Sequence, residues 1–198
     1  MAELGGHVLQ HLGLAASALA LALVVAVPLG ILAANRAALR GGVLGLASVG
    51  RTLPSLAILM LLLPLLGVGV APAVVALALL AIPPIVINVD VGIRGVAPAA
   101  LEAATAMGMT GAQRFFRVIV PLAIPVSLSG VRTATTETIA SATLATFIGA
   151  GGLGDEIVRG LQTDNSPLLF GAAAVVAALA LGADLLLAAS GRLAAREA

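Results

Sequence analysis

Two charged side chains inside an otherwise apolar segment are the strongest candidates for a chemical role in this sequence. Arg132 and Glu137 lie about 17 and 24 Å beyond Pro121 if residues 121–148 form one helix. A charge in a membrane interior is costly, so each is expected to face a bundle interior or a water-filled cavity. Two interpretations stay open. Either Arg132 forms a structural ion pair with Glu137 or Asp184, or Glu137 lines a pathway and offers a negative site to a cationic solute.

Asp90 and Asp184 are the other acidic residues expected within or beside apolar segments. Asp90 precedes Arg94 by four residues, a spacing that places both side chains on one helix face and predicts an ion pair at the membrane boundary. Asp184 precedes Arg192 by about two helical turns. Together with Glu137, these acids make an ion or proton relay an alternative interpretation.

Two histidines near the N-terminus have the spacing of metal ligands but lack the rest of a site. His7 and His11 are four residues apart, so they share one face of a helix. A zinc site requires a third ligand, and a zinc protease also requires a glutamate between the histidines. Val8, Leu9 and Gln10 supply neither. We therefore expect solvated or interfacial histidines and no metal; the absence of Cys excludes disulfides and thiolate sites.

A glycine-rich stretch matches the dinucleotide fingerprint in its letters alone. Gly149 to Gly154 reads G-x-G-x-x-G, but that motif binds a nucleotide only between a strand and a helix, and here it follows an apolar segment. We expect a tight, closely packed turn within a polar loop from Gly149 to Ser166. A Walker A motif requires a lysine, and the sequence contains ten Arg and no Lys. No nucleotide site is therefore expected in this chain.

The elements that hold these residues are expected to be membrane helices. Of the 198 residues, 61% are hydrophobic and 10% are charged, whereas soluble domains carry about 25% charged residues. We predict an all-α, polytopic membrane protein with one domain, residues 1–198, and about five spans. These spans are residues 12–34, 53–70, 72–89, 121–148 and 167–189. The first run exceeds a signal-peptide core of about 7 to 15 residues and is expected to be retained.

The arginines favour one orientation of these spans. With the N-terminus outside and the C-terminus in the cytoplasm, the outer loops receive only Arg159. The inner side then receives Arg36, Arg40, Arg94, Arg114, Arg117, Arg192 and Arg196. The positive-inside rule predicts this arrangement, which places residues 94–120 in the cytoplasm.

Residues 98–121 predict two short helices joined by an elbow. Pro98 suits the first helical position, and Gly108 suits the residue after the last turn, so the first helix is expected from Pro98 to Met107. Thr110 and Gln113 have the spacing of a capping box for a second helix, and Pro121 is expected to mark the next change of direction. The first helix carries small side chains that another protein backbone could approach closely: Ala99, Ala100, Ala103, Ala104 and Ala106.

This segment resembles the EAA motif of ABC importer permeases. Glu102-Ala103-Ala104 is followed by Gly108 and then by Val118-Ile119-Val120-Pro121, in which Val120 replaces the usual Leu. The resemblance implies a MetI-like type I ABC importer permease fold, with residues 94–120 as a coupling segment that sits in a groove of an ATPase subunit. The coupling residues that it implies are Glu102, Ala103, Ala104, Gly108, Met109 and Arg114. The alternative is an interfacial hairpin that only joins two spans.

Three more stretches are similar to permeases of the osmoprotectant branch, which imports glycine betaine, choline and carnitine. Their patterns are R-T-(I/L)-P-S-L-A at residues 51–57, G-I-(K/R)-G-V at residues 92–96 and A-T-L-A-x-x-I-G-A-G-G-L-G-(D/E) at residues 142–155. Arg132 also fits the branch pattern G-(I/V)-R-T, whereas Glu137 and Asp90 depart from it. The resemblance covers residues 51–161.

The resemblance implies a multi-pass permease subunit of the inner (cytoplasmic) membrane that is not an enzyme and holds no cofactor. ATP and Mg²⁺ would bind a separate ATPase. The expected partners are ATPase subunits, a second permease subunit that is identical or paralogous, an extracytoplasmic substrate-binding protein and the lipid bilayer, but no nucleic acid. The expected pathway residues are Asn88, Arg132, Thr133, Glu137 and Thr143. Because the chain lacks Trp and Tyr, which hold a quaternary ammonium ion best, tight recognition is expected on the binding protein.

Two alternatives to osmoprotectant import remain at this stage. One is an ABC permease for another small solute, such as an amino acid or its derivative. The other is an ion-coupled secondary carrier, with Asp90, Glu137 and Asp184 as the relay. An intramembrane enzyme is disfavoured because no nucleophile or metal set is recognisable.

Overall fold

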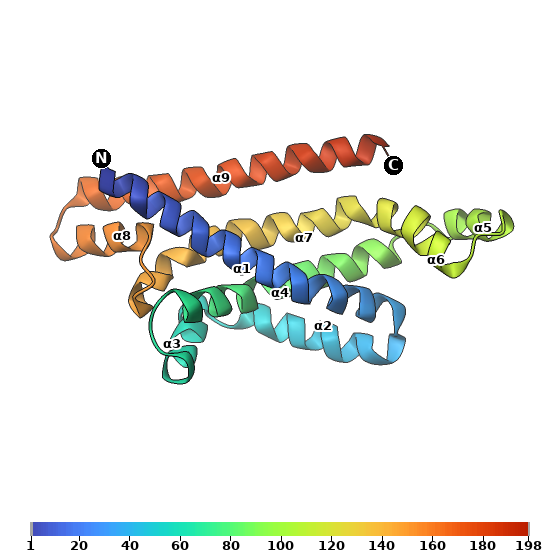
Figure 1. Cartoon of the computed structure of the whole chain (residues 1–198), viewed down its shortest axis with the longest axis horizontal. Helices are drawn as coiled ribbons and strands as arrows, with labels where there is room; N and C mark the ends of the chain where they lie inside the picture. The colour runs from blue at the N-terminus through green and yellow to red at the C-terminus, as the bar shows by residue number, and fades with distance from the viewer. Residues whose placement is uncertain (1, 198) are drawn as a thin grey trace.

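The fold is a bundle of long helices with two short helical extensions. The computed structural model describes residues 2–197, with the side chains of residues 4–191. The long helices are α1 (Ala2–Asn35), α4 (Val70–Arg94), α7 (Val120–Ser141) and α9 (Ser166–Glu197); the shorter ones are α2 (Ala37–Thr52), α3 (Ser55–Leu66), α5 (Pro98–Ala106), α6 (Gly111–Arg114) and α8 (Leu153–Gln162). Helix α1 packs along α4, α4 along α7, and α7 along α9 (Figure 1). Arg192 and Arg196 lie outside the residues whose side chains are described.

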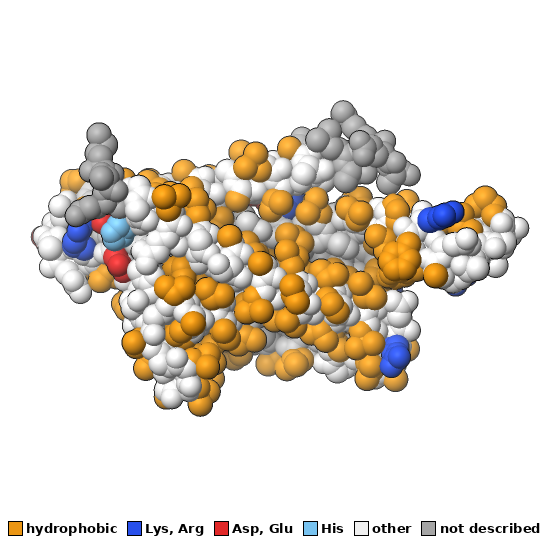
Figure 2. Space-filling view, in the orientation of Figure 1, with side chains coloured by type: hydrophobic (Ala, Val, Ile, Leu, Met, Phe, Trp, Pro, Cys, Tyr) orange, Lys and Arg blue, Asp and Glu red, His pale blue; other side chains and the backbone are white. Residues whose placement is uncertain are grey.

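The described residues contain helices suited to a membrane and no strand, which confirms the prediction of an all-α membrane protein. Four helical stretches are long and apolar enough to cross a bilayer: 4–35, 70–94, 111–148 and 166–191. Helices α2 and α3 make a fifth span if the bent pair is counted as one. Figure 2 shows hydrophobic side chains spread over the lateral surface, while most charged side chains visible in this view lie towards its two ends.

The second predicted span, residues 53–70, has a different form in the structure. Helices α2 and α3 meet at an angle of 101°. Pro54 disfavours helical backbone at the residue before it, and Leu53 accordingly has φ −76° and ψ 129°. Helix α3 has 12 residues and is therefore about 18 Å long, too short to cross a hydrocarbon core of about 30 Å alone. The bend thus turns α3 away from the direction of α2, and α3 packs against α4.

Small residues allow α1 and α4 to approach closely. Ala18, Ala22 and Ala26 recur every four residues along α1 and are fully buried. Gly30 continues this stripe, and a Cβ atom there would lie 2.6 Å from Cβ of Val89 on α4. Small side chains at such spacing are the usual means of close helix packing in membranes, where lipid competes equally for larger apolar groups.

Residues 149–166 form a turn and a helix, so the prediction of a polar loop there was wrong. The expected tight turn is confirmed: Gly149, Gly151 and Gly152 have φ values of 73°, 78° and 90°. Helix α8 then runs from Leu153 to Gln162 and packs against α9. Leu153, Glu156 and Gly160 are buried at spacings of three and four residues, whereas Arg159 and Gln162 are exposed, which is the pattern of a helix with one buried face.

The two short extensions lie at opposite ends of the molecule. In Figure 1, α5 and α6 project beyond the bundle at one end, and α8 lies at the other end near the start of α1. The predicted coupling segment is therefore separated from the glycine turn by the length of the long helices. One end of the molecule thus carries the α5–α6 extension, and the other carries the glycine turn and α8.

Candidate functional site

The elbow in the predicted coupling segment has the predicted geometry. Helix α5 ends at Ala106, and Gly108 adopts φ 75°, a conformation that favours glycine. The capping box is also confirmed: the Gln113 backbone N–H donates to Thr110 Oγ1 at 3.3 Å, and the Thr110 backbone N–H donates to Gln113 Oε1 at 2.9 Å. Two backbone donors at the start of α6 are thus satisfied by side chains.

The outer surface of α5 presents part of the predicted docking face. Glu102 and Ala103 are exposed, whereas Ala104 is fully buried and so cannot contact another protein directly. Arg114 Nη1 donates to Thr105 Oγ1 at 3.1 Å, which ties α6 to α5. A shallow hollow of about 490 Å³ lies between the two helices. Its lining residues are Leu101, Glu102, Thr105, Ala106 and Arg114.

The chain passes from this elbow into the membrane without a further break. After α6, residues Phe115–Ile119 form one turn of π-helix, and α7 begins at Val120. Pro121 follows the π-helical turn closely, and the backbone is helical on both sides of it. The predicted change of direction at Pro121 was therefore wrong. A π-helical turn often occurs at a functional site, and here it joins the coupling segment to a span.

Arg132 forms an ion pair with Asp184, one of the two partners, Glu137 and Asp184, that the sequence left open. Arg132 Nη2 lies 2.8 Å from Asp184 Oδ2, and Arg132 Nε donates to Asp184 Oδ1 at 3.1 Å. The pair connects α7 to α9. Glu137 takes no part in it: its side chain is exposed, and no ion pair or hydrogen bond reaches it from the described residues.

The predicted pair of Asp90 with Arg94 is absent, because Asp90 binds Arg40 instead. Asp90 is fully buried on α4, and Arg40 on α2 donates to both of its carboxylate oxygens. Arg94 lies one turn further along α4, where its side chain is exposed. A buried carboxylate requires a cation that reaches inward from a neighbouring helix, which the local i,i+4 rule does not consider.

Three predicted pathway residues satisfy local hydrogen bonds. Asn88 Nδ2 donates to the Pro84 carbonyl oxygen at 2.8 Å. The Asn88 side chain lies against Gly130, where α4 and α7 are in close contact. Thr133 Oγ1 donates to the Ser129 carbonyl oxygen at 3.1 Å, and Thr143 Oγ1 donates to the Ala140 carbonyl oxygen at 2.7 Å. Hydroxyl groups bound in this way leave their acceptor sites free for water or solute.

One face of α7 exposes polar groups within a candidate span. Ser129, Glu137 and Ala140 are exposed, and Thr133 is half-buried. Their spacing of three and four residues places all four on one helix face. The Ser129 and Thr133 hydroxyls donate to carbonyl oxygens of their own helix, but the Glu137 carboxylate is costly against lipid, so this part of the face is better suited to water or another protein.

The glycine turn is held to the first helix by a polar cluster that the sequence did not predict. Gln10 Nε2 donates to the Ala150 carbonyl oxygen at 2.9 Å, and Gln10 Oε1 accepts from the Gly152 N–H at 3.1 Å. His11 is fully buried, with Nε2 2.9 Å from the Ile139 carbonyl oxygen, so the expectation of solvated or interfacial histidines was wrong for this residue. His7 Nδ1 lies 3.0 Å from the Gly152 carbonyl oxygen.

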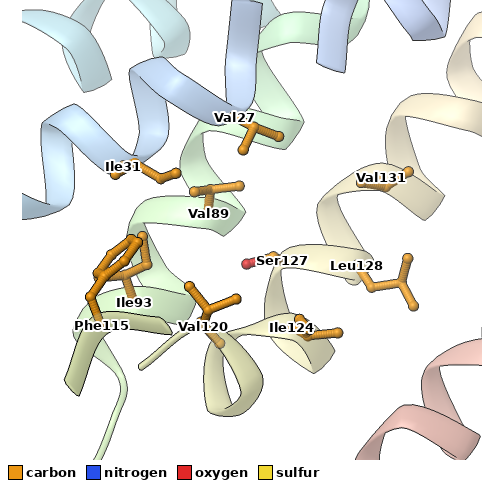
Figure 3. A pocket seen from close by; sticks show the side chains of 11 residues that line it. Val27, Ile31, Val89, Ile93, Phe115, Val120, Ile124, Ser127, Leu128 and Val131 are labelled. Carbon is orange, nitrogen blue, oxygen red and sulfur yellow. The ribbon is translucent and has the colours of Figure 1, made fainter. Parts of the chain in front are cut away.

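An apolar pocket of about 270 Å³ lies among α1, α4, the π-helical turn and α7 (Figure 3). Val27 and Ile31 line it from α1, and Val89 and Ile93 line it from α4. Ser127 is the single polar residue in the lining. None of the predicted pathway residues contributes to this pocket.

Comparison with known proteins identifies the family. The family model for the binding-protein-dependent transport system inner membrane component matches residues 26–196. The chain is 43% identical over 192 residues to the glycine betaine/carnitine/choline transport system permease protein OpuCB of Bacillus subtilis, covering 95% of this chain and 88% of that protein. It is 45% identical over 172 residues to the carnitine transport permease protein OpuCB of Listeria monocytogenes, covering 87% and 79%. It is 39% identical over 183 residues to the osmoprotectant import permease protein OsmW of Salmonella typhimurium, covering 90% and 85%.

Solved structures support the same fold. An inward-facing form of the MetNI methionine ABC transporter superposes with a TM-score of 0.85 at 21% identity, covering 96% of this chain and 95% of that chain. An amino acid ABC transporter with histidines gives a TM-score of 0.76 at 22% identity, covering 94% and 92%. The chain therefore belongs to the family of binding-protein-dependent transport system inner membrane components, and is a membrane transport subunit rather than an enzyme.

Proposed function

We propose that this chain is the permease subunit of an ATP-driven importer for a small osmoprotectant such as glycine betaine, choline or carnitine. The observation that carries the proposal is the identity of 39–45%, over 87–95% of the chain, to three permeases named for such solutes. The family match favours import through an ABC complex over the ion-coupled carrier that the sequence left open.

The remaining parts of the importer follow from membership of the family. The family implies an ATPase subunit and a substrate-binding protein as partners, and we propose that ATP and Mg²⁺ bind the ATPase subunit. We propose that a second permease subunit, identical or paralogous, completes the pathway, because the exposed polar face of α7 needs water or protein against it. We also propose that the α5–α6 end faces the cytoplasm, where the positive-inside rule puts most arginines.

The coupling role is assigned to the exposed part of the α5–α6 elbow. Glu102, Ala103 and Gly108 are accessible to a partner, and the Arg114–Thr105 hydrogen bond fixes the two short helices relative to each other. Ala104 and the half-buried Met109 support the elbow from within. Movement of the elbow would pass to α4 and α7, the bundle helices that precede and follow it in the chain.

Within the membrane, we assign the solute pathway to the face of α7 that carries Ser129, Thr133 and Glu137. The unpaired Glu137 carboxylate attracts the cationic group of the solute. The Ser129 and Thr133 hydroxyls take the place of water molecules around the solute. The chain has no Trp or Tyr with which to hold a quaternary ammonium ion tightly. A weak site is suited to a pathway, since a solute that binds tightly would leave slowly.

The cargo is tested by reconstituting this permease with its ATPase and binding protein in vesicles. Uptake of radiolabelled glycine betaine, choline and carnitine is measured beside methionine and histidine, with ATP inside the vesicles or absent. The proposal expects ATP-dependent uptake of at least one of the three osmoprotectants. Uptake confined to an amino acid would contradict the proposed cargo but retain the importer.

Coupling is tested by Ala103→Asp, which adds bulk and charge to the exposed face of α5. Ala38→Asp on α2 is the matched control, because Ala38 is also exposed and lies outside the elbow. Ala103→Asp is expected to abolish uptake and substrate-stimulated ATP hydrolysis while the protein stays in the membrane; Ala38→Asp should leave both intact. Normal uptake by Ala103→Asp would refute the coupling role.

A further inference from the structure

The first turns of α1 hold the glycine turn and α8 through polar side chains on one helix face. His7, Gln10 and His11 are spaced three and four residues apart, so they share that face. Gln10 and His11 bind only backbone groups there, whereas His7 also faces a charged side chain, Glu156 of α8. His11 is fully buried, but the His7 side chain is 27% exposed. His7 is therefore the histidine that water reaches, and histidine is the side chain that changes charge between about pH 5 and 8.

The His7 ring lies between two hydrogen-bond acceptors. Its Nδ1 lies 3.0 Å from the Gly152 carbonyl oxygen, and its Nε2 lies 3.7 Å from Glu156 Oε1. A carbonyl oxygen only accepts, so Nδ1 carries the hydrogen of that bond. In a neutral ring, Nε2 is then a bare acceptor that faces a carboxylate. In a protonated ring both nitrogens carry hydrogen, so each acceptor faces a donor. The surroundings of His7 therefore match the imidazolium form of the ring.

Glu156 has one carboxylate oxygen available for such a cation. Its side chain is 3% exposed, and Oε2 already accepts from Arg159 Nη2, one turn further along α8. Within the described residues, only His7 approaches Oε1. The neighbouring Asp155 is hydrogen-bonded elsewhere, and residues 166–183 of α9 carry no charge. Figure 2 shows a histidine beside acidic and basic side chains at this end. Because one partner is buried, water and salt screen the pair less than they screen an exposed one.

We propose that His7 is a proton-sensitive latch, which clamps α1 on the glycine turn and α8 when it is protonated and loosens when it is neutral. The latch lies at the end of the bundle opposite the α5–α6 elbow (Figure 1). On the proposed orientation this is the outer side of the membrane. Acid outside would then oppose opening of this end, and alkali would favour it. The device thus adds control by external pH to a transport cycle that ATP drives.

Hydrogen exchange at residues 149–154 tests the latch in the permease–ATPase complex. Protection is measured at about pH 6 and about pH 8, on either side of the ordinary histidine range. It is corrected with an unfolded peptide of the same sequence, because intrinsic exchange also depends on pH. Protection is expected to be about threefold greater at the lower pH, the effect of a partly exposed ion pair. Residues 41–45 of α2, which include no titratable side chain, should show no such difference. Equal protection of residues 149–154 at both pH values would overturn the proposal.

Two substitutions identify the groups responsible. His7→Asn retains an amide N–H for the Gly152 carbonyl but takes up no proton, so it should show the lower protection at both pH values. Glu156→Gln retains the histidine and its bond to that carbonyl but removes the negative charge, so it should also abolish the pH difference. Leu9→Asn is the matched control, because Leu9 lies two residues from His7 and is 73% exposed. It should keep the pH difference of the unchanged protein.

A pH difference that persists in His7→Asn would refute His7 as the proton site. One that persists in Glu156→Gln would refute the carboxylate as its partner. Size-exclusion chromatography of each complex distinguishes a loosened turn from loss of folding, and the unchanged protein decides the question by itself if both variants fail to fold. The readout depends neither on the solute nor on the orientation, so failure of the cargo proposal leaves this test intact.

Discussion

Arg40 on α2 and Asp90 on α4 form an ion pair in which the acid is fully buried and the base is partly exposed. Arg40 Nη2 lies 2.9 Å from Asp90 Oδ2, and the exposed fractions of the two side chains are 38% and 0%. The pair joins the first half of the broken second span to the helix that enters the predicted coupling segment. Because the partners differ in access to water, their removal should have unequal effects.

Arg40→Gln is predicted to destabilise the permease more than Asp90→Asn. The first change leaves a carboxylate buried without a cation, whereas the second leaves an arginine that can turn towards water or lipid headgroups. The temperature at which the complex loses its size-exclusion peak is a suitable measure, since the chain has no Trp, Tyr or Cys to serve as an optical or thiol probe. Greater loss in Asp90→Asn would contradict the assigned burial.

The Arg132–Asp184 pair is predicted to stabilise the fold through contact of opposite charges, whichever of the two helices carries the cation. Arg132→Gln and Asp184→Asn should each lower heat resistance, because each leaves one charge unpaired between α7 and α9. The exchange Arg132→Asp with Asp184→Arg should recover part of the loss. Glu137→Gln is the comparison: without a partner in the described residues, it should leave heat resistance unchanged and reduce uptake of a cationic solute. An exchange variant no better than the single changes would argue against a direct pair.

Local signals predicted those features of the fold that depend on neighbours in the chain. Gly108, Thr110 and Gln113 produced a correct elbow because caps and positive φ values are decided within a few residues. Long apolar runs predicted the membrane helices for the same reason. Pro54 marks the break, since it disfavours helix at Leu53, but hydropathy placed one whole span at residues 53–70 and did not indicate helix α2 before it.

Features that depend on packing between distant helices were not predictable in this way. Asp90 has Arg94 at a suitable local spacing, yet its partner comes from α2, fifty residues earlier in the chain. His11 and Gln10 looked like polar residues at the start of a span, and their contacts lie with residues 139–152. An acid in an apolar helix signals that a partner exists, but the sequence does not say which helix provides it.

Gly130→Ala is predicted to separate α4 from α7 and to destabilise the fold by about 1 to 3 kcal/mol. An added Cβ atom would lie 2.5 Å from Cβ of Asn88 and 2.6 Å from the Pro84 carbonyl oxygen, so neither neighbour can rotate away. Gly182→Ala on α9 is the matched control, because a Cβ atom there would have no described neighbour within 4 Å beyond the backbone of its own helix. Its heat resistance should be unchanged or slightly higher, as alanine favours helix. Equal effects of the two substitutions would show that α4 and α7 are not packed this closely.

Gln10→Leu is predicted to release the glycine turn from α1. Gln10 both donates to the Ala150 carbonyl and accepts from the Gly152 N–H, so leucine leaves two backbone groups without partners at a cost of about 1 to 3 kcal/mol. Gln10→Glu keeps the acceptor and loses the donor, and its effect should be intermediate. Leu9→Gln is the control, since Leu9 is adjacent and 73% exposed. Hydrogen exchange at residues 149–154 measures the release directly: faster exchange is expected in Gln10→Leu, and unchanged exchange would mean that packing of Gly152 on His11 holds the turn by itself.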